Sequence, residues 1–160
     1  MDTYLTIASR REVREYADRP LPEDVVHRIL DAGRLSGSSQ NTQQWEFVIV
    51  SDRGSLAECV YAPGNLRGAA LVVAITGPAR PFDVGRAAQN MLLAAWNEGV
   101  GSVPNGVRDA EAAERIVGAR VAIVLSFGYP ARPRDPEARS AEAWSARAKR
   151  KPFDEVVRRV

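Results

Sequence analysis

Four segments of the sequence contain residues whose types and spacing suit the binding of a small molecule. The first holds Arg10, Arg11 and Arg14, and each guanidinium group offers a rigid fork of N–H donors. Such a fork matches phosphate oxygens and the carbonyl edge of a planar ring. Glu12 and Glu15 stand among these arginines and could neutralise them, so the cluster could also be a solvated basic loop.

The other three segments also allow an ordinary structural interpretation. The range 36–45 consists mainly of small polar residues, so its backbone and hydroxyl donors could approach a ligand closely, or it could simply connect two elements. The range 99–106 starts with Gly-x-Gly, but it follows a predicted helix and Pro104 replaces the third glycine, which excludes a Rossmann fingerprint. The range 149–152 is a basic run that, alone, is typical of an exposed surface.

Several other kinds of chemistry are excluded by residues that the sequence lacks. Cys59 is the only cysteine and His27 the only histidine, so an internal disulfide and a cysteine-based or His-pair metal site cannot form. We expect Cys59 to be a small buried residue and His27 to be exposed on a helix. The sequence has no P-loop and no nucleophile elbow. It therefore predicts no metal site, and a Ser/His triad could use only His27.

Length and charge limit the remaining classes of protein. The 160 residues, of 17.5 kDa, form one predicted domain that is long enough to bury a core. No apolar run reaches the roughly 18 residues that span a bilayer, and the first residues do not resemble a secretory signal, so we expect a cytoplasmic protein without a membrane partner. The net charge is +2, and residues 130–160 carry nine Lys and Arg against five Asp and Glu. Such a basic tail could bind nucleic acid or a phosphate-bearing ligand, or form a solvated face.

Turn signals divide the chain into alternating helices and strands that must position these segments. Helices are predicted over 4–8, from 21–24 to a polar loop over 33–41, from Asp83 as the cap to about Glu98, over 109–117, and in a last turn after 153. Strands are predicted over 45–50, 69–76 and 121–129, with both faces buried. This alternation predicts an α/β or α+β sandwich.

Taken together and in this order, the four segments resemble the nitroreductase family of flavoproteins. Residues 10–16 (RREVREY) are similar to the family's opening Arg-Arg-Ser-x-Arg-x-Phe, and residues 36–45 to its Pro-Ser-Ser-x-Asn-x-Gln-Pro-Trp stretch. Residues 83–101 resemble its long central helix, which ends in Gly-x-Gly, and residues 150–156 (RKPFDEV) resemble its closing Arg-x-Pro-Leu-Glu-Glu-Val. The resemblance covers nearly the whole chain.

The resemblance implies a single FMN-binding domain over 1–160, of α+β class, with a mixed sheet flanked by helices in an intertwined homodimer. FMN would lie at the interface between the two subunits, and the helix over 84–98 would form the dimer core. The residues assigned to the cofactor fall into groups by role: Arg10, Arg11 and Arg150 at the phosphate, Arg14 at the pyrimidine edge, Ser38, Ser39 and Asn41 reaching the flavin from the partner chain, Pro104, Asn105 and Gly106 near flavin N5, and Asn65 and Asp83 as further candidates.

The activity that the resemblance implies is oxidoreduction. A hydride would pass from NADH or NADPH to flavin N5 and then, in a ping-pong reaction, to a nitroaromatic, quinone or similar conjugated acceptor. No catalytic side chain is required, because the flavin carries the hydride. The alternative is an FMN-binding or storage protein with little nicotinamide-driven turnover. Because a small-molecule phosphate accounts for the basic tail, we expect no nucleic-acid partner.

The sequence also departs from the family pattern. Glu12 stands where the family has a small hydroxyl residue, and Gly37 and Gln44 replace two prolines, which predicts a more flexible loop. Between Phe82 and Val121 there is room for the central helix and little else. The helices that cover the substrate in longer members are therefore expected to be missing, which would leave the flavin face open.

Overall fold

A computed structural model describes all residues from 1 to 160. The chain forms two compact units, one made of residues 1–11 and 135–160 and the other of residues 12–134. The larger unit contains the whole β-sheet, and the smaller unit is helical.

The larger unit is built around four strands: β1 (Glu46–Ile49), β2 (Leu71–Thr76), β3 (Gly101–Asn105) and β4 (Val121–Gly128). Their order is β1-β2-β4-β3, and every neighbouring pair is antiparallel. The expected α+β class is confirmed. The expected mixed character of the sheet is not, since the only parallel pairing is an isolated bridge between Glu12 and Ser102.

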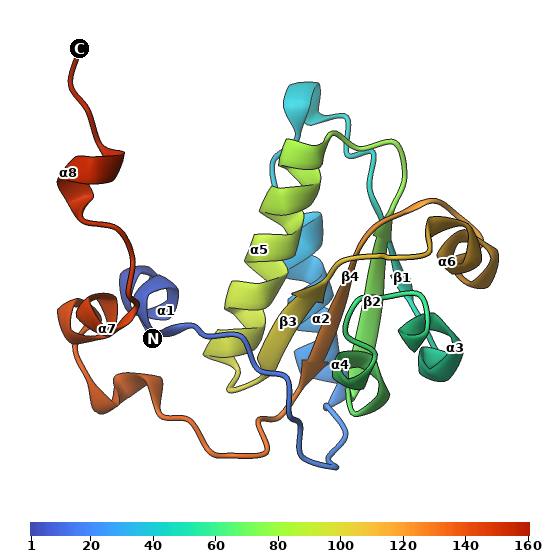
Figure 1. The fold of residues 1–160 in the computed structure, drawn as a ribbon, viewed down its shortest axis with the longest axis horizontal. Helices are drawn as coiled ribbons and strands as arrows, with labels where there is room; N and C mark the ends of the chain where they lie inside the picture. The colour runs from blue at the N-terminus through green and yellow to red at the C-terminus, as the bar shows by residue number, and fades with distance from the viewer. The chain divides into compact units, whose positions relative to one another are not determined.

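Helices cover both faces of this sheet (Figure 1). The side chains of β2 alternate between the faces, as the pleat requires. Leu71, Val73 and Ile75 pack on one side with α2 (Glu23–Arg34) and α5 (Pro81–Asn97). The intervening β2 residues pack on the other side, in a core that also includes residues of α3 (Arg53–Ala57), α4 (Gly64–Arg67) and α6 (Ala110–Val117).

The strand predictions are correct for the centre of the sheet and less so for its edges. Every residue of β2 is buried, as its continuous apolar run predicts. In β1 both ends are exposed, and Ile49 has 52% of its surface accessible, because β1 is an edge strand. The other edge strand, β3, was not predicted. Its sequence GSVPN contains proline, which interrupts a central ladder but is tolerated at an edge.

The central helix α5 starts earlier than the sequence indicates. Pro81 occupies its first turn, where a missing N–H has no cost, and the N-cap is Arg80. Asp83 therefore lies inside the first turn and is not the cap, which corrects the prediction. The remaining predicted helices are present, including α6, which Asp109 caps by accepting from the N–H of Ala112.

The smaller unit contains α1 (Thr3–Ser9), the 3₁₀ turn η2 (Pro136–Ala138), α7 (Ala141–Arg147) and α8 (Phe153–Val156). The Trp144 indole N–H donates to the Pro136 carbonyl at 2.7 Å, and the guanidinium carbons of Arg11 and Arg139 lie 5.5 and 5.1 Å from its ring centroid. Trp144 therefore packs within this unit. In neither unit does a helix have the length and apolar character needed to cross a membrane.

Candidate functional site

The serine-rich loop over 36–45 joins α2 to β1 through a series of tight turns. Its 3₁₀ turn η1 (Ser39–Asn41) includes Gln40 and Asn41, both with φ of 54°, and Gln43 follows with φ of 49°. Asparagine visits this left-handed region more readily than most side chains. The Ser38 hydroxyl oxygen accepts from the Gln43 N–H at 2.9 Å, which closes the loop on itself. The loop thus holds a set of hydroxyl, amide and backbone groups in a defined arrangement.

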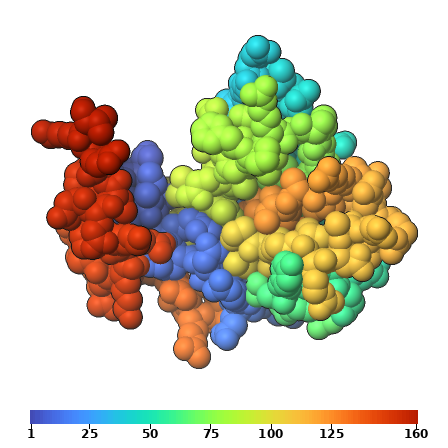
Figure 2. Space-filling model, turned by 45° about the horizontal axis from the view of Figure 1, so that its top comes forward, coloured from blue at the N-terminus to red at the C-terminus, as the bar shows by residue number.

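The loop is anchored to α5 at two points. Asp83 is buried, and its Oδ2 accepts from the Ser39 N–H at 3.2 Å. Further along the helix, the Asn90 amide donates to the Ser36 hydroxyl at 2.7 Å. In Figure 2 the loop, in cyan, lies against the first turns of α5, in light green. Asp83, in the first turn of α5, thus holds the serine-rich loop in place through Ser39.

Replacing Asp83 with alanine is expected to loosen the serine-rich loop. The change removes a buried carboxylate acceptor from the Ser39 N–H, and such charge-assisted bonds contribute about 1.5–3 kcal/mol. Amide hydrogen exchange should show faster exchange at Ser39. As a matched control, Asp109→Ala removes the same kind of bond at the start of α6 and should leave Ser39 unchanged. Equal exchange at Ser39 in both variants would contradict an anchoring role for Asp83.

Two of the candidate residues, Asn65 and Asn105, lie buried and in contact with each other. Asn65, on α4, donates from Nδ2 to Oδ1 of Asn105 at 2.8 Å, and Asn105 lies at the end of β3. The side chain of Asn105 therefore lies on the face of the sheet that α4 covers. Its neighbours Pro104 and Gly106 are exposed, and the Gly106 carbonyl accepts from the N–H of Tyr61 at 3.2 Å.

Arg14 lies at a small polar hollow of about 290 Å³ in the larger unit. Two extended segments form it, held together by an antiparallel bridge between Tyr16 and Pro130 and by the Ala131 N–H donating to the Glu15 carbonyl at 3.0 Å. The charged residues that line the hollow are Glu12, Arg14, Glu15, Arg132 and Arg134. With three arginines against two glutamates, the hollow favours an anionic group. Arg132 and Arg134 were not singled out from the sequence, where they look like part of a Pro/Arg linker.

Arg10, Arg11 and Arg150 belong to the smaller unit. The Arg11 guanidinium donates to the carbonyl oxygens of Ala8 at 2.7 Å and Trp144 at 3.0 Å, so it holds α1 to α7. Arg11 therefore has a structural role in this unit, and its place near a phosphate stays a prediction. Arg10 is half-buried at the end of α1, and Arg150 is exposed after α7.

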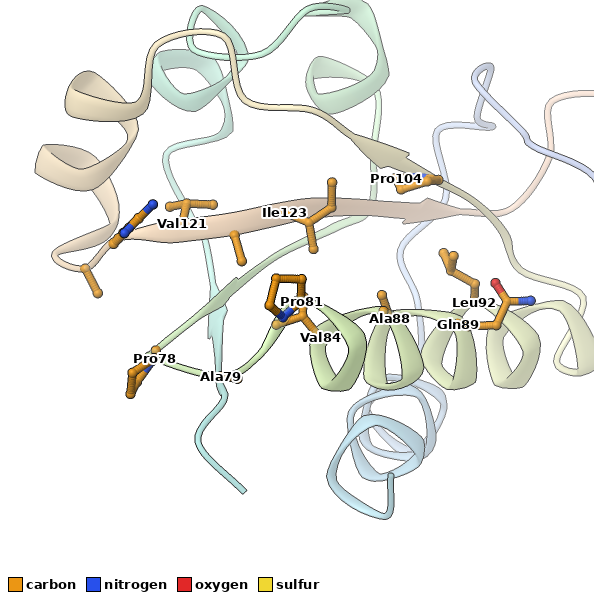
Figure 3. A pocket seen from close by; sticks show the side chains of 15 residues that line it. Pro78, Ala79, Pro81, Val84, Ala88, Gln89, Leu92, Pro104, Val121 and Ile123 are labelled. Atoms are coloured by element: carbon orange, nitrogen blue, oxygen red, sulfur yellow. The ribbon is translucent and has the colours of Figure 1, made fainter. Parts of the chain in front are cut away.

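An open apolar groove of about 1110 Å³ runs along the larger unit. Figure 3 shows Val84, Ala88 and Leu92 of α5 on one wall, with Ile123 of β4 and Pro104 of β3 opposite. The helical spacing of four residues that places the α5 side chains on one stripe is visible in the sequence. The facing wall cannot be recognised from the sequence, since it combines residues of two separate strands, β3 and β4.

The single histidine and the single cysteine lie where the sequence predicts. His27 is exposed on α2, and Cys59 is buried beside α3. Burial raises the pKa of the Cys59 thiol above its usual value, and the nearby carboxylate of Asp109 raises it further. A buried thiol with a raised pKa holds little nucleophilic thiolate at neutral pH.

Comparison with known proteins gives consistent matches. The sequence matches the family model described as Nitroreductase family over residues 7–70 and 65–129. A protein of Methanothermobacter thermautotrophicus, provisionally named NADH dehydrogenase/NAD(P)H nitroreductase, is 31% identical, and the match covers 82% of this chain and 78% of the relative.

Solved structures share the fold. A protein of Parabacteroides distasonis with the same provisional name is 28% identical with a TM-score of 0.77, over 88% of this chain and 94% of that one. An FMN-dependent nitroreductase of Clostridium difficile has a TM-score of 0.74 at 24% identity, over 81% and 88% of the two chains.

Proposed function

Because the chain belongs to the nitroreductase family, we propose that it is an FMN-dependent oxidoreductase that takes a hydride from NADH or NADPH. The observation that carries this proposal is the family match, which extends from residue 7 to residue 129 and so includes three of the four candidate segments. The names of the similar proteins support the donor and the cofactor, since one names NAD(P)H and another FMN.

The residues of this structure fit an anionic, planar cofactor. The hollow at Arg14 has an excess of guanidinium groups, which suits the electron-rich pyrimidine edge of a flavin. The serine-rich loop presents Ser38, Ser39 and Asn41 at a surface anchored by Asp83. We assign the FMN phosphate to Arg10 and Arg150, on the resemblance of their segments to the family's motifs.

FMN, when bound, supplies reversible hydride acceptance and release at its N5 atom. The side chains of this protein would bind and orient it. The positive charge of Arg14 would stabilise the negative charge that the pyrimidine gains on reduction. The exposed residues Pro104, on the edge strand β3, and Gly106, directly after it, would border the reactive part of the ring. No acid or base from His27 or Cys59 is required.

The acceptors that we propose are flat, conjugated molecules such as nitroaromatics and quinones, reduced in a ping-pong reaction.

We also propose a homodimer with FMN at the subunit interface. The open apolar groove between α5 and strands β3 and β4 supports the dimer, because side chains of a second subunit could fill it. Arg10, Arg11 and Arg150 would serve this site from one chain, and the serine-rich loop from its partner.

The proposal is tested by the visible spectrum of the purified protein after FMN is added and free FMN removed. We expect retained flavin bands that bleach when NADH or NADPH is added without oxygen. Return of the bands on adding a quinone would establish the second half-reaction. Bands that stay oxidised with either nucleotide would favour an FMN-binding or storage protein, and a colourless protein would contradict both.

A further inference from the structure

A chain of hydrogen bonds crosses the larger unit from its first extended segment to α4. The Tyr16 hydroxyl lies 3.1 Å from the Ser126 hydroxyl of β4, which in turn lies 3.1 Å from Nδ2 of Asn105 on β3. Oδ1 of Asn105 then accepts from Nδ2 of Asn65 on α4 at 2.8 Å. Asn105, Ser126 and Asn65 are all buried. The chain links the segment that carries Arg14 to the segment that carries Pro104 and Gly106.

The backbone determines which way the Asn105 amide points. Its nitrogen lies 3.1 Å from the carbonyl oxygen of Val103 and 3.4 Å from that of Val124, and a carbonyl can only accept. The amide oxygen of Asn105 must therefore face Asn65. Because that oxygen needs a donor, Asn65 must present its nitrogen to it.

The same constraint turns the oxygen of Asn65, at the opposite edge of its amide group, away from Asn105. Asn65 has only 7% of its surface exposed, but its Oδ1 is not among the fully buried polar atoms, and its one side-chain bond is made by Nδ2. An acceptor that solvent can reach and that no protein group uses is open to a hydrogen bond from a bound ligand. Asn105 fixes the position of the Asn65 nitrogen, and Oδ1 is therefore the acceptor that Asn65 can offer to a ligand.

We propose that Asn105, supported by Ser126, is a positioning residue that holds the Asn65 oxygen ready to accept a hydrogen bond from an N–H or O–H group of the bound cofactor. This inference rests on the proposed FMN function. It assigns Asn65 a fixed polarity, which its sequence position alone does not give. It also makes Asn105 act through Asn65, with its own side chain not touching the cofactor.

The test uses the FMN affinity of two variants at Asn65, measured by flavin fluorescence at several pH values. Asn65→Leu should weaken FMN binding about tenfold at every pH, since it has no acceptor. Asn65→Asp should bind weakly at high pH, where its carboxylate faces the oxygen of Asn105. At low pH the protonated acid can donate to Asn105 and still present an acceptor, so its affinity should return toward that of the wild type.

Each affinity is expressed relative to the wild type at the same pH, which removes the titration of FMN itself. Asn97→Asp, on the exposed end of α5, should follow the wild type throughout. A flat ratio for Asn65→Asp, or wild-type affinity in Asn65→Leu, would overturn the inference while leaving the proposed function intact. A wild-type protein that binds no FMN would instead contradict the proposed function.

A double-mutant cycle tests whether Ser126 acts through Asn65, and it does not depend on the pH series. Ser126→Ala should weaken FMN binding about threefold in the wild type and have no further effect in Asn65→Leu. Equal effects in both backgrounds would mean a general structural role and would overturn the proposal that Ser126 positions Asn65.

Lumiflavin, which keeps the ring N–H but lacks the ribityl hydroxyls, identifies the donor group of the cofactor. If Asn65→Leu weakens lumiflavin binding, the donor lies on the ring. If lumiflavin binding is unchanged, the donor lies on the ribityl chain.

Discussion

Arg10→Ala and Arg150→Ala are each expected to weaken FMN binding by about tenfold to a hundredfold. Each removes a guanidinium that we assign to the phosphate, and hydrogen bonds to charged groups contribute about 1.5–3 kcal/mol. The measurements are the FMN retained after desalting and the dissociation constant from flavin fluorescence. Arg150→Lys should restore part of the affinity, because lysine keeps the charge but loses the bidentate fork.

Riboflavin, which lacks the phosphate, separates this assignment from a general loss of structure. Both alanine variants should bind riboflavin as the wild type does. Arg34→Ala is the matched surface control, since Arg34 pairs only with Asp31 on α2, at 2.6 Å, and should not affect either ligand. If riboflavin binding fell as much as FMN binding, the two arginines would not be phosphate ligands.

The part of the fold that could be predicted from the sequence is the part that local patterns determine. The apolar run of β2 and the stripe of α5 depend on neighbouring residues, and both elements are present. Edge or central position depends on strand order, which a single sequence does not reveal. For this reason β1 was expected to be buried on both faces and β3, with its proline, was overlooked.

In the candidate site, too, the sequence identifies residues but does not reveal their long-range contacts. The resemblance places Asn105 near flavin N5 and names Asn65 and Asp83 as further candidates, but it does not give the contacts of their side chains. Asp83 was expected to cap a helix, and instead it holds a loop 44 residues away in the sequence. Asn65 and Asn105 are bonded across 40 residues, and the polarity of that bond follows from carbonyls on β3 and β4. Contacts of this kind require the folded chain.

Gly77→Ala is expected to destabilise the larger unit by about 3 kcal/mol, a large effect for the addition of one methyl group. Gly77 follows β2 with φ of 95°, a left-handed conformation that costs an alanine roughly 1–2 kcal/mol. In addition, a Cβ at this position would collide with the carbonyl oxygen of Gln44 and lie 3.4 Å from Cα of Trp45. Both contacts are backbone atoms, so relief requires the chain itself to shift, which typically costs about another 1–3 kcal/mol.

Gly118→Ala separates the two contributions. Gly118 also has a left-handed φ, of 82°, as the C-cap of α6, but a Cβ there would meet no other atom. Gly118→Ala should therefore lose only the conformational part of the unfolding free energy, about 1–2 kcal/mol, measured by urea unfolding.

The difference in unfolding free energy between the two variants measures how closely the β2–α5 turn approaches the end of the serine-rich loop. Since that loop carries Ser38, Ser39 and Asn41, Gly77→Ala should also weaken FMN binding, whereas Gly118→Ala should not. Equal losses of stability in the two variants would show that the turn at Gly77 has room for a side chain and that the loop does not depend on this contact.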